Sequence, residues 1–215
     1  MQNALRIPAP PRLPTANEEY LRQDQEVFNN TLRLYFNQLS NGLQNIAGTN
    51  GGKYVECPNG LFFNTGEQTF AAVDTAYPVV YDQTYLSNAV ALRSGSTSQI
   101  QVTVGGIYNF QYTGQVISGS ANAKNIYLWI KRNGVNIGYS TRANTLSANN
   151  EYLELQWAFN IDLQANDYLE LEASVSDTDL HLHAETATSP HPGIPSSVMT
   201  VNYISPLPDT LPTPP

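Results

Sequence analysis

The segment Gln99–Phe110, QIQVTVGGIYNF, limits the possible folds more than any other part of the chain. Apolar and polar residues alternate along it, the run breaks at Gly105-Gly106, and an aromatic run follows. Such alternation indicates a strand with one buried face, because successive side chains of a strand point to opposite sides. The same pattern recurs in Asn125–Ile137, Tyr152–Val175 and Val198–Ile204. The second half of the chain is therefore predicted to consist of short strands.

Turn residues between these runs predict antiparallel connections. Asn133-Gly134 separates IYLWIKR from VNIGYS, which is the commonest signal for a tight type I′ hairpin. Asn166-Asp167 separates FNIDL from YLELEAS, and we expect a connection of the same kind there. Strands at this spacing without intervening helices favour an antiparallel sandwich or barrel. The tryptophans Trp129 and Trp157 lie on apolar strands, where we expect them to pack in the core.

The N-terminal region predicts a proline-rich docking arm over residues 1–17. Pro8, Pro10, Pro11 and Pro14 remove backbone donors and favour extended geometry over helix or central strand. Such an arm either stays disordered or docks as an extended peptide in a groove of a partner. Residues 48–60, which include the glycine-rich stretch 48–52, predict a linker. Residues 61–205 are left for the β domain, and 206–215 form a second proline-rich tail.

Residues 18–47 predict an amphipathic helix that serves oligomerisation or attachment. Asn17 suits an N-cap, and Glu18 suits the positive end of a helix dipole. Apolar side chains then recur at heptad spacing, at Leu21, Phe28, Leu32, Tyr35, Leu39, Leu43 and Ile46. A helix with so wide an apolar face is not stable alone in water, so it must pack on something. We favour self-association; a neighbouring protein or the chain's own β domain is the alternative.

Charge and composition argue against several classes of partner. The net charge is −8, and residues 61–215 carry five of the 10 basic and thirteen of the 18 acidic side chains. An acidic surface repels phosphate backbones, so we expect no nucleic-acid partner. No run approaches the roughly 18 apolar residues of a membrane span, and the N-terminus lacks the apolar core of a secretory signal. We therefore expect no membrane insertion. The single cysteine, Cys57, excludes a disulfide within the chain.

Three motifs resemble one known family. The segment QIQVTVGGIYNFQYTGQV is similar to the central strand pair of the tumour-necrosis-factor and complement-head jelly rolls. NIYLWIKRNGVNI resembles their apolar strand with its following K-N-G, and LELQWAFNIDLQANDYLELEASV resembles their L-x-L-x-x-G-D-x-V-x-L segment. Asn166 replaces the usual glycine there, a mild change because Asn tolerates the left-handed backbone. The resemblance implies a ten-strand jelly roll that assembles as a trimer, with aromatic residues of one sheet edge around the three-fold axis.

A second resemblance concerns residues 11–41. The segment PRLPTANEEYLRQDQEVFNNTLRLYFNQLSN is similar to the opening of structural proteins from tailed phages of marine bacteria. In those proteins an arm and a helix precede a variable domain. This likeness implies a location in the virion, on either the head or the tail. Together the two resemblances give the expected fold class: mainly β, an antiparallel jelly-roll sandwich preceded by an extended Pro-rich arm and one long N-terminal α-helix.

Few side chains suggest a metal or catalytic site. His181 and His183 lie two apart on an expected strand, so both imidazoles would share one face and could form a metal ring with symmetry mates. The alternative, which we favour, is two polar residues on the solvent face of an edge strand, with no metal and no cofactor. Glu170 and Glu172 are expected to be solvated, as are Asp177 and Asp179. Calcium between Asp177, Asp179 and Glu185 is a further alternative.

The sequence contains no nucleophile elbow, P-loop, dinucleotide fingerprint or zinc-protease motif. We therefore expect a non-enzymatic phage virion protein, a homotrimeric fibre or head decoration held by residues 1–47 and displaying the jelly roll. Its partners would be its own copies and other virion proteins. The alternative is an adhesin module that binds a host-surface carbohydrate or receptor.

Overall fold

The computed structural model describes residues 10–13, 21–47 and 57–208, and side chains within α1 only as far as residue 44. The chain divides into two units, Met1–Glu56 and Cys57–Pro215. Most of the arm predicted for residues 1–17 lies outside the described residues, as do most of the predicted linker and of the C-terminal tail. No helix in the described part of the chain combines the length and apolarity that crossing a membrane requires.

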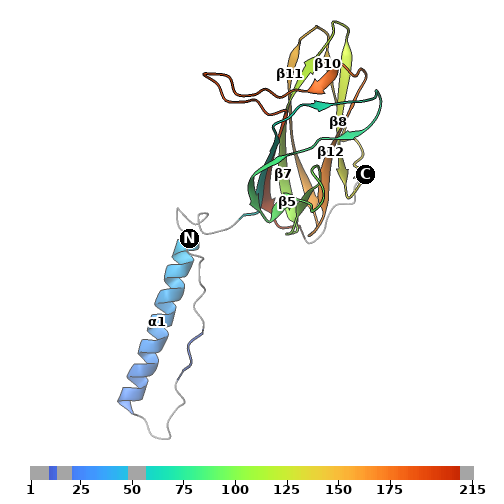
Figure 1. Cartoon of the computed structure of the whole chain (residues 1–215). Coiled ribbons are helices and arrows are strands. Elements are labelled where there is room, and N and C mark those ends of the chain that lie inside the picture. The colour runs from blue at the N-terminus through green and yellow to red at the C-terminus, as the bar shows by residue number, and fades with distance from the viewer. Residues whose placement is uncertain (1–9, 14–20, 48–56, 209–215) are drawn as a thin grey trace. The chain divides into compact units, whose positions relative to one another are not determined.

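The first unit contains the helix α1, Arg22–Ala47 (Figure 1). It begins after Leu21, whose carbonyl accepts hydrogen bonds from the backbone N–H groups of Asp24 (3.1 Å) and Gln25 (3.2 Å). Asp24 in the first turn suits the positive end of the helix dipole. Arg22, the first residue of α1, forms an i,i+4 ion pair of 2.9 Å with Glu26. The predicted N-cap Asn17 and Glu18 lie outside the described residues.

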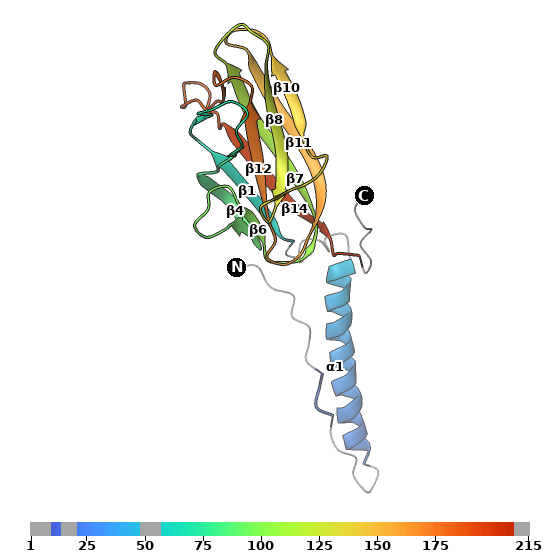
Figure 2. The ribbon, with the colours of Figure 1, turned by 90° about the vertical axis from the view of Figure 1, so that its right-hand side faces the viewer.

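The second unit is an antiparallel sandwich of two sheets (Figures 1 and 2). The β7 sheet runs in the order β2-β13-β7-β14-β1-β4. β11 pairs with β7 along the edge opposite to β13 and β14. The β8 sheet runs in the order β10-β8-β12-β6-β5, with β3 paired to β12 and β9 to β8. The strands are β1 Asn59–Asn64, β2 Gln68–Thr69, β3 Tyr77–Pro78, β4 Gln83–Asn88, β5 Val90–Leu92, β6 Ile100–Val102, β7 Gly106–Ser118, β8 Lys124–Arg132, β9 Val135–Asn136, β10 Arg142–Leu146, β11 Tyr152–Leu163, β12 Tyr168–Val175, β13 Leu180–Leu182 and β14 Ser197–Ser205. The predicted fold class is confirmed.

Alternating side chains of both sheets fill the core. Along β7 every second residue is buried, including Tyr108, Phe110 and Tyr112, and β8 buries Ile126 and Leu128 in the same manner. This is the period of two that the sequence shows. At the edge strand β11, the rings of Phe159 and Phe110 stack at 5.4 Å. The core is thus built from the predicted alternating runs.

The glycine pair at 105–106 turns the chain from one sheet to the other. β6 belongs to the β8 sheet and β7 to the β7 sheet, so the break in alternation marks a corner. A Cβ atom on Gly106 would overlap the ring of Tyr203 and the carbonyl oxygen of Ser205. Only glycine lets the backbone approach β14 this closely.

The two predicted turns differ in outcome. Asn133 (φ 50°) and Gly134 (φ 80°) form the tight hairpin between β8 and β9, with Arg132 opposite Val135, as predicted. Asn166 is also left-handed (φ 73°), but it joins β11 of the β7 sheet to β12 of the β8 sheet. The prediction of a hairpin there is wrong, because β11 pairs with β7 along its whole length while β12 pairs with β8.

The tryptophans also differ. Trp157 on β11 is partly buried and packs against the core, as expected. Trp129 on β8 lies at an outward position between the buried Leu128 and Ile130, and its indole N–H donates to Asn136 Oδ1 at 2.9 Å. The expectation of a core tryptophan is wrong at Trp129, because the strand register places it on the opposite face.

Candidate functional site

The two histidines near β13 lie on a strand that has neighbours on both sides. β13 pairs with β7 on one side and with β2 on the other, so the expectation of an edge strand is wrong. Leu180 and Leu182 are fully buried, which places His181 on the outer face of the sheet. His183 follows the strand and stays in line because its backbone N–H donates to the carbonyl of Gln115 at 2.8 Å. Both imidazoles therefore share one face, as the spacing predicts.

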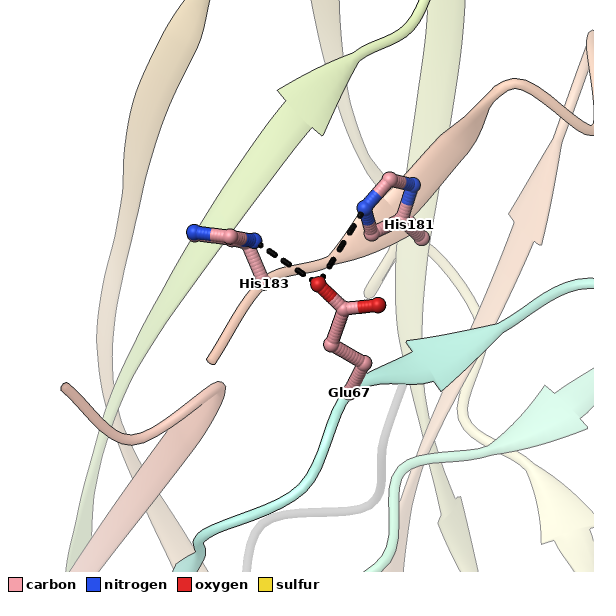
Figure 3. Close-up of side chains that lie close together, drawn as sticks. All are labelled: Glu67, His181 and His183. Carbon is pink, nitrogen blue, oxygen red and sulfur yellow. Dashed lines mark hydrogen bonds and ion pairs between the residues drawn. The ribbon is translucent and has the colours of Figure 1, made fainter. Parts of the chain in front are cut away.

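The short strand β2 brings a carboxylate to the same place. Leu182 lies opposite Gln68 and His181 opposite Thr69, so Glu67, just ahead of β2, comes level with His183. Figure 3 shows both imidazoles turned toward the Glu67 carboxylate. Its Oε1 lies 3.0 Å from His183 Nδ1 and 3.7 Å from His181 Nε2. Sequence reasoning missed Glu67, which no motif links to residues more than a hundred positions away.

A second carboxylate holds the other nitrogen of His183. Glu185 Oε1 lies 2.9 Å from His183 Nε2. Glu185 is itself fixed by a pair of backbone hydrogen bonds with Ile194, of 2.9 and 2.8 Å. The ring of Tyr152 meets the His183 ring edge to face at 5.3 Å. With 12% of its side chain exposed, His183 is the least accessible member of this histidine cluster, which we define as Glu67, His181, His183 and Glu185.

The donor atoms of Glu67, His181 and His183 lie within 4.8 Å of one another. Imidazole nitrogen and carboxylate oxygen are common ligands of zinc and related ions. A groove of about 500 Å³ borders the cluster at Glu185. Its other lining residues are Phe63, Thr65, Thr186, Ala187, Gly193, Ile194 and Pro195. Chemically, the cluster is suited to hold a divalent ion or a small polar group.

The structure contradicts the alternative of a calcium ion between Asp177, Asp179 and Glu185. The buried ammonium of Lys124 lies 3.4 Å from Asp177 and 3.0 Å from Asp179, so both carboxylates already face a cation. Hydrogen bonds from Lys124 and Ser120, together with the Lys124 charge, lower the pKa of Asp179. Glu185 faces His183 instead.

Glu170 and Glu172 on β12 are not fully solvated, contrary to the expectation from the sequence. Glu172 is buried and forms an ion pair of 2.7 Å with Lys131 of β8. Glu170 accepts a hydrogen bond of 2.8 Å from the hydroxyl of Ser98. Both side chains are part of the outer surface of the β8 sheet, where cross-strand partners neutralise or satisfy them.

The outer face of the β7 sheet is different, and we call it the amide face. Its centre is a chain of side-chain amides: Gln111 donates to Asn109, and Asn109 donates to Asn160 of β11, both at 2.8 Å. The outward residues of the two central strands are uncharged; they are Ile107, Asn109, Gln111, Thr113, Gln115 and Ile117 on β7 and Val198, Thr200, Asn202 and Ile204 on β14.

The residues predicted for oligomerisation or attachment lie along α1 and just ahead of it. Phe28, Leu32, Tyr35 and Leu39 are half-buried, whereas Leu21 is 52% and Leu43 57% exposed. The side chain of Ile46 lies outside the described residues. Three further apolar side chains of the helix are exposed, namely Val27, Leu34 and Phe36. This apolar stripe and the histidine cluster belong to different units of the chain.

Known proteins offer a likeness of architecture. The chain is similar to the solved globular domain of the zebrafish complement 1qA protein, with 14% sequence identity and a TM-score of 0.47. The likeness covers 71% of this chain and 100% of that chain. No protein-family model matches the sequence, and no curated protein matches it.

Proposed function

We propose that the protein is a non-enzymatic, homotrimeric structural protein of a phage virion, a fibre or a head decoration. Residues 1–47 attach it to other virion proteins, and the jelly roll is displayed. The observation that carries the trimer is the uncharged amide face. The resemblance of residues 11–41 to phage structural proteins supports the virion role.

The amide face has the composition of a protein interface. Cores of interfaces are depleted of charge, because an ion that loses its water there must find a partner. On this face the only charged outward side chains of β11, β7 and β14 are Glu154 and Asp162, near the two ends of β11. Amides and hydroxyls in between can exchange hydrogen bonds with a second copy.

The strand β11 supplies the complementary surface. Among the described strands it pairs only with β7, so a twelve-residue edge is open. Trp157, Phe159 and Ile161 are only partly buried along it. A long open edge with apolar side chains tends to associate, and natural proteins usually protect it. Packing this edge against the amide face of the next copy gives a head-to-tail contact, which closes as a ring when the rotation allows it.

Attachment through residues 1–47 is supported by the apolar stripe of α1. Exposed apolar side chains in such number mark a surface that another helix or protein covers. Leu21 and Leu43, together with the half-buried Phe28, Leu32, Tyr35 and Leu39, are the residues that we propose for this contact. In a trimer the stripe either joins three helices or binds a neighbouring virion protein.

Light scattering tests the assembly. We expect three times the chain mass for the full chain and also for the unit Cys57–Pro215. A trimeric full chain with a monomeric unit would move self-association to α1, and a monomeric full chain would contradict the proposal. Labelling of intact virions with an antibody against the unit then tests the virion role; absence of the protein from purified particles would refute it.

A second role, binding to a host-surface carbohydrate or receptor, is favoured by one observation. Tyr139, beyond the hairpin of β8 and β9, is fully exposed, and the neighbouring Val135 is 70% exposed. Aromatic rings with a free face are suited to stack on sugars or on a receptor. A glycan array should show saturable binding that Tyr139→Ala abolishes; binding that survives this change would exclude Tyr139 as the contact.

A further inference from the structure

We infer that Glu67, His181 and His183 form a binding site for a divalent transition-metal ion, for which Zn²⁺ is the best-suited representative. Glu185 acts as the positioning carboxylate of His183. The site lies within one chain and does not depend on the trimer or on the virion role. It also replaces the expectation of no metal, and it differs from a ring of histidines contributed by three copies.

The donor set and its spacing fit such an ion. Zinc takes His nitrogen and carboxylate oxygen at about 2.0–2.2 Å, so neighbouring ligand atoms of a tetrahedron stand about 3.3 Å apart. Glu67 Oε1 lies 3.0 Å from His183 Nδ1 and 3.7 Å from His181 Nε2. Small side-chain rotations therefore bring all three atoms to coordination distance. Calcium and magnesium prefer sets of oxygen ligands and suit this site less well.

Glu185 provides an independent indication. A metal-ligating histidine nearly always donates its second ring N–H to a carboxylate or carbonyl, which fixes the tautomer and raises the basicity of the ligand. The 2.9 Å contact between His183 Nε2 and Glu185 Oε1 supplies this partner. It leaves Nδ1, the nitrogen that faces Glu67, with its lone pair free for a metal.

The ligands stand on a rigid support. The side chain of Gln68, next to Glu67, donates to the hydroxyls of Ser196 (3.1 Å) and Ser197 (3.0 Å) and accepts from the N–H of Val80 (2.8 Å). β13 is hydrogen-bonded on both sides. Ligands held by such supports lose little entropy on binding, which raises affinity.

The site also has room for exchange with solvent. The side chains of His181 and Glu67 are 25% and 46% exposed, so an ion can reach them from solution. Three protein ligands leave a fourth tetrahedral position, which we expect a water molecule to occupy. The groove that borders Glu185 offers space on one side of the cluster.

Without a metal, the same side chains admit a second arrangement, which the test must separate from the first. A doubly protonated His183 donates from both nitrogens, one to Glu67 and one to Glu185. In that arrangement neither ring nitrogen of His183 has a free lone pair, so the cluster binds no ion. The two arrangements predict opposite results in a titration with metal.

The test is calorimetric titration of ZnCl₂ into the full chain at neutral pH, after treatment with a chelator. We expect one Zn²⁺ per chain, and no binding by His181→Gln/His183→Gln. Glu185→Gln should retain the stoichiometry and weaken affinity about 10- to 100-fold. His191→Gln, at the exposed third histidine, is the matched control and should bind as the unchanged protein does.

Folding is checked separately, because a lost site must not be confused with a lost fold. Circular dichroism of each metal-free variant should match that of the unchanged protein, and Zn²⁺ should raise the melting temperature only where the site is intact. Absence of binding to the unchanged chain would overturn the inference. So would binding that survives the double histidine change, or a stoichiometry of one ion per three chains.

Discussion

The two outer faces of the sandwich differ in the charge of their outward side chains. Each is built on long antiparallel strands with a shared core beneath, yet β12 and β8 of the β8 sheet carry paired charges, whereas the central strands β7 and β14 of the β7 sheet carry none. On the β8 sheet, Lys131 pairs with the buried Glu172 at 2.7 Å, and Arg93 lies over the ring of Tyr168 at 4.9 Å. On the amide face of the β7 sheet, the uncharged side chain of Gln111 donates a hydrogen bond to that of Asn109.

This difference in charge indicates which face of the sandwich contacts another copy of the chain. Charges on an outer face favour water, and pairs such as Lys131 with Glu172 are already satisfied within the chain. Neutral amides and apolar side chains can give up water at little electrostatic cost. The acidic character predicted for the β domain is therefore not spread evenly, and we place the trimer on the face whose central strands β7 and β14 carry no charge.

The largest expected effect comes from placing a charge on the amide face. Thr113→Arg puts a guanidinium at the centre of β7, where a neighbouring copy would bury it without a partner. We expect the particle mass from light scattering to fall from three chains to one. Ser174→Arg, at a half-buried outward position of β12 in the β8 sheet, is the matched control and should stay trimeric. Equal behaviour of the two variants would erase the distinction between the faces.

Breaking the ion pair of the β8 sheet should affect stability without affecting assembly. Lys131→Met leaves the buried carboxylate of Glu172 unpaired, which costs roughly 3 kcal/mol in free energy of unfolding. The double change with Glu172→Leu should recover most of that loss. Gln111→Leu on the amide face should change stability by less than about 0.5 kcal/mol.

These free energies are best measured by denaturant unfolding in the monomeric Thr113→Arg background, because assembly otherwise adds to the stability. A loss for Gln111→Leu as large as that for Lys131→Met would contradict the assignment of the two faces.

Acidification should reduce the contribution that Asp167, which pairs with Arg132 of β8, makes to the free energy of unfolding. Burial by itself would raise the pKa of Asp167, but hydrogen bonds from Asn133 and the N–H of Gln164, with the charge of Arg132, lower it overall. A pKa below the usual 3.8 of an aspartate means that the carboxylate stabilises the fold above that pH, and that this contribution is lost as pH falls through the folded value.

The free energy of unfolding at pH 7 and pH 3 checks this. Asp167→Asn should lose less stability on acidification than the unchanged protein does. Glu154→Gln, an exposed change on β11 of the amide face, should behave as the unchanged protein. The prediction is wrong if both variants respond to acid alike.

A smaller effect than that of Lys131→Met is expected in the core that both faces share. Among the described residues, the buried hydroxyls of Tyr81 and Tyr112 have no hydrogen-bond partner. Burial raises the pKa of Tyr112, and burial together with Tyr112 raises that of Tyr81. Because tyrosines in the unfolded chain ionise with a pKa near 10.0, stability should fall as pH rises above that value. Tyr112→Phe should raise stability by about 1 kcal/mol and reduce this alkaline loss.

Thermal unfolding between pH 8 and pH 11 measures both parts of this prediction. Tyr139→Phe, at the fully exposed tyrosine, is the control and should change neither value. A loss of stability in Tyr112→Phe would indicate that its hydroxyl has a bonding partner, such as a buried water molecule.

Local patterns predicted much of the architecture because their physics is local. Alternation along residues 99–116 predicts β7 and its buried face, and Asn133-Gly134 predicts the hairpin of β8 and β9. The positive φ at Asn166 follows from the residue type, but the partner strands on either side of it do not. Strand pairing depends on contacts between distant segments, so a turn signal alone cannot distinguish a hairpin from a crossing between sheets.

The candidate site shows the same division. His181 and His183 share a face because their spacing matches the period of a strand, which the sequence by itself determines. Only the tertiary structure decided three other features of the outer surface. Glu67 contacts the histidines from the strand β2 side, Lys124 pairs with Asp177 and Asp179, and Glu172 is buried. The reason is physical: periodicity fixes which side chains of one segment point together, whereas register between segments fixes which side chains of different segments meet.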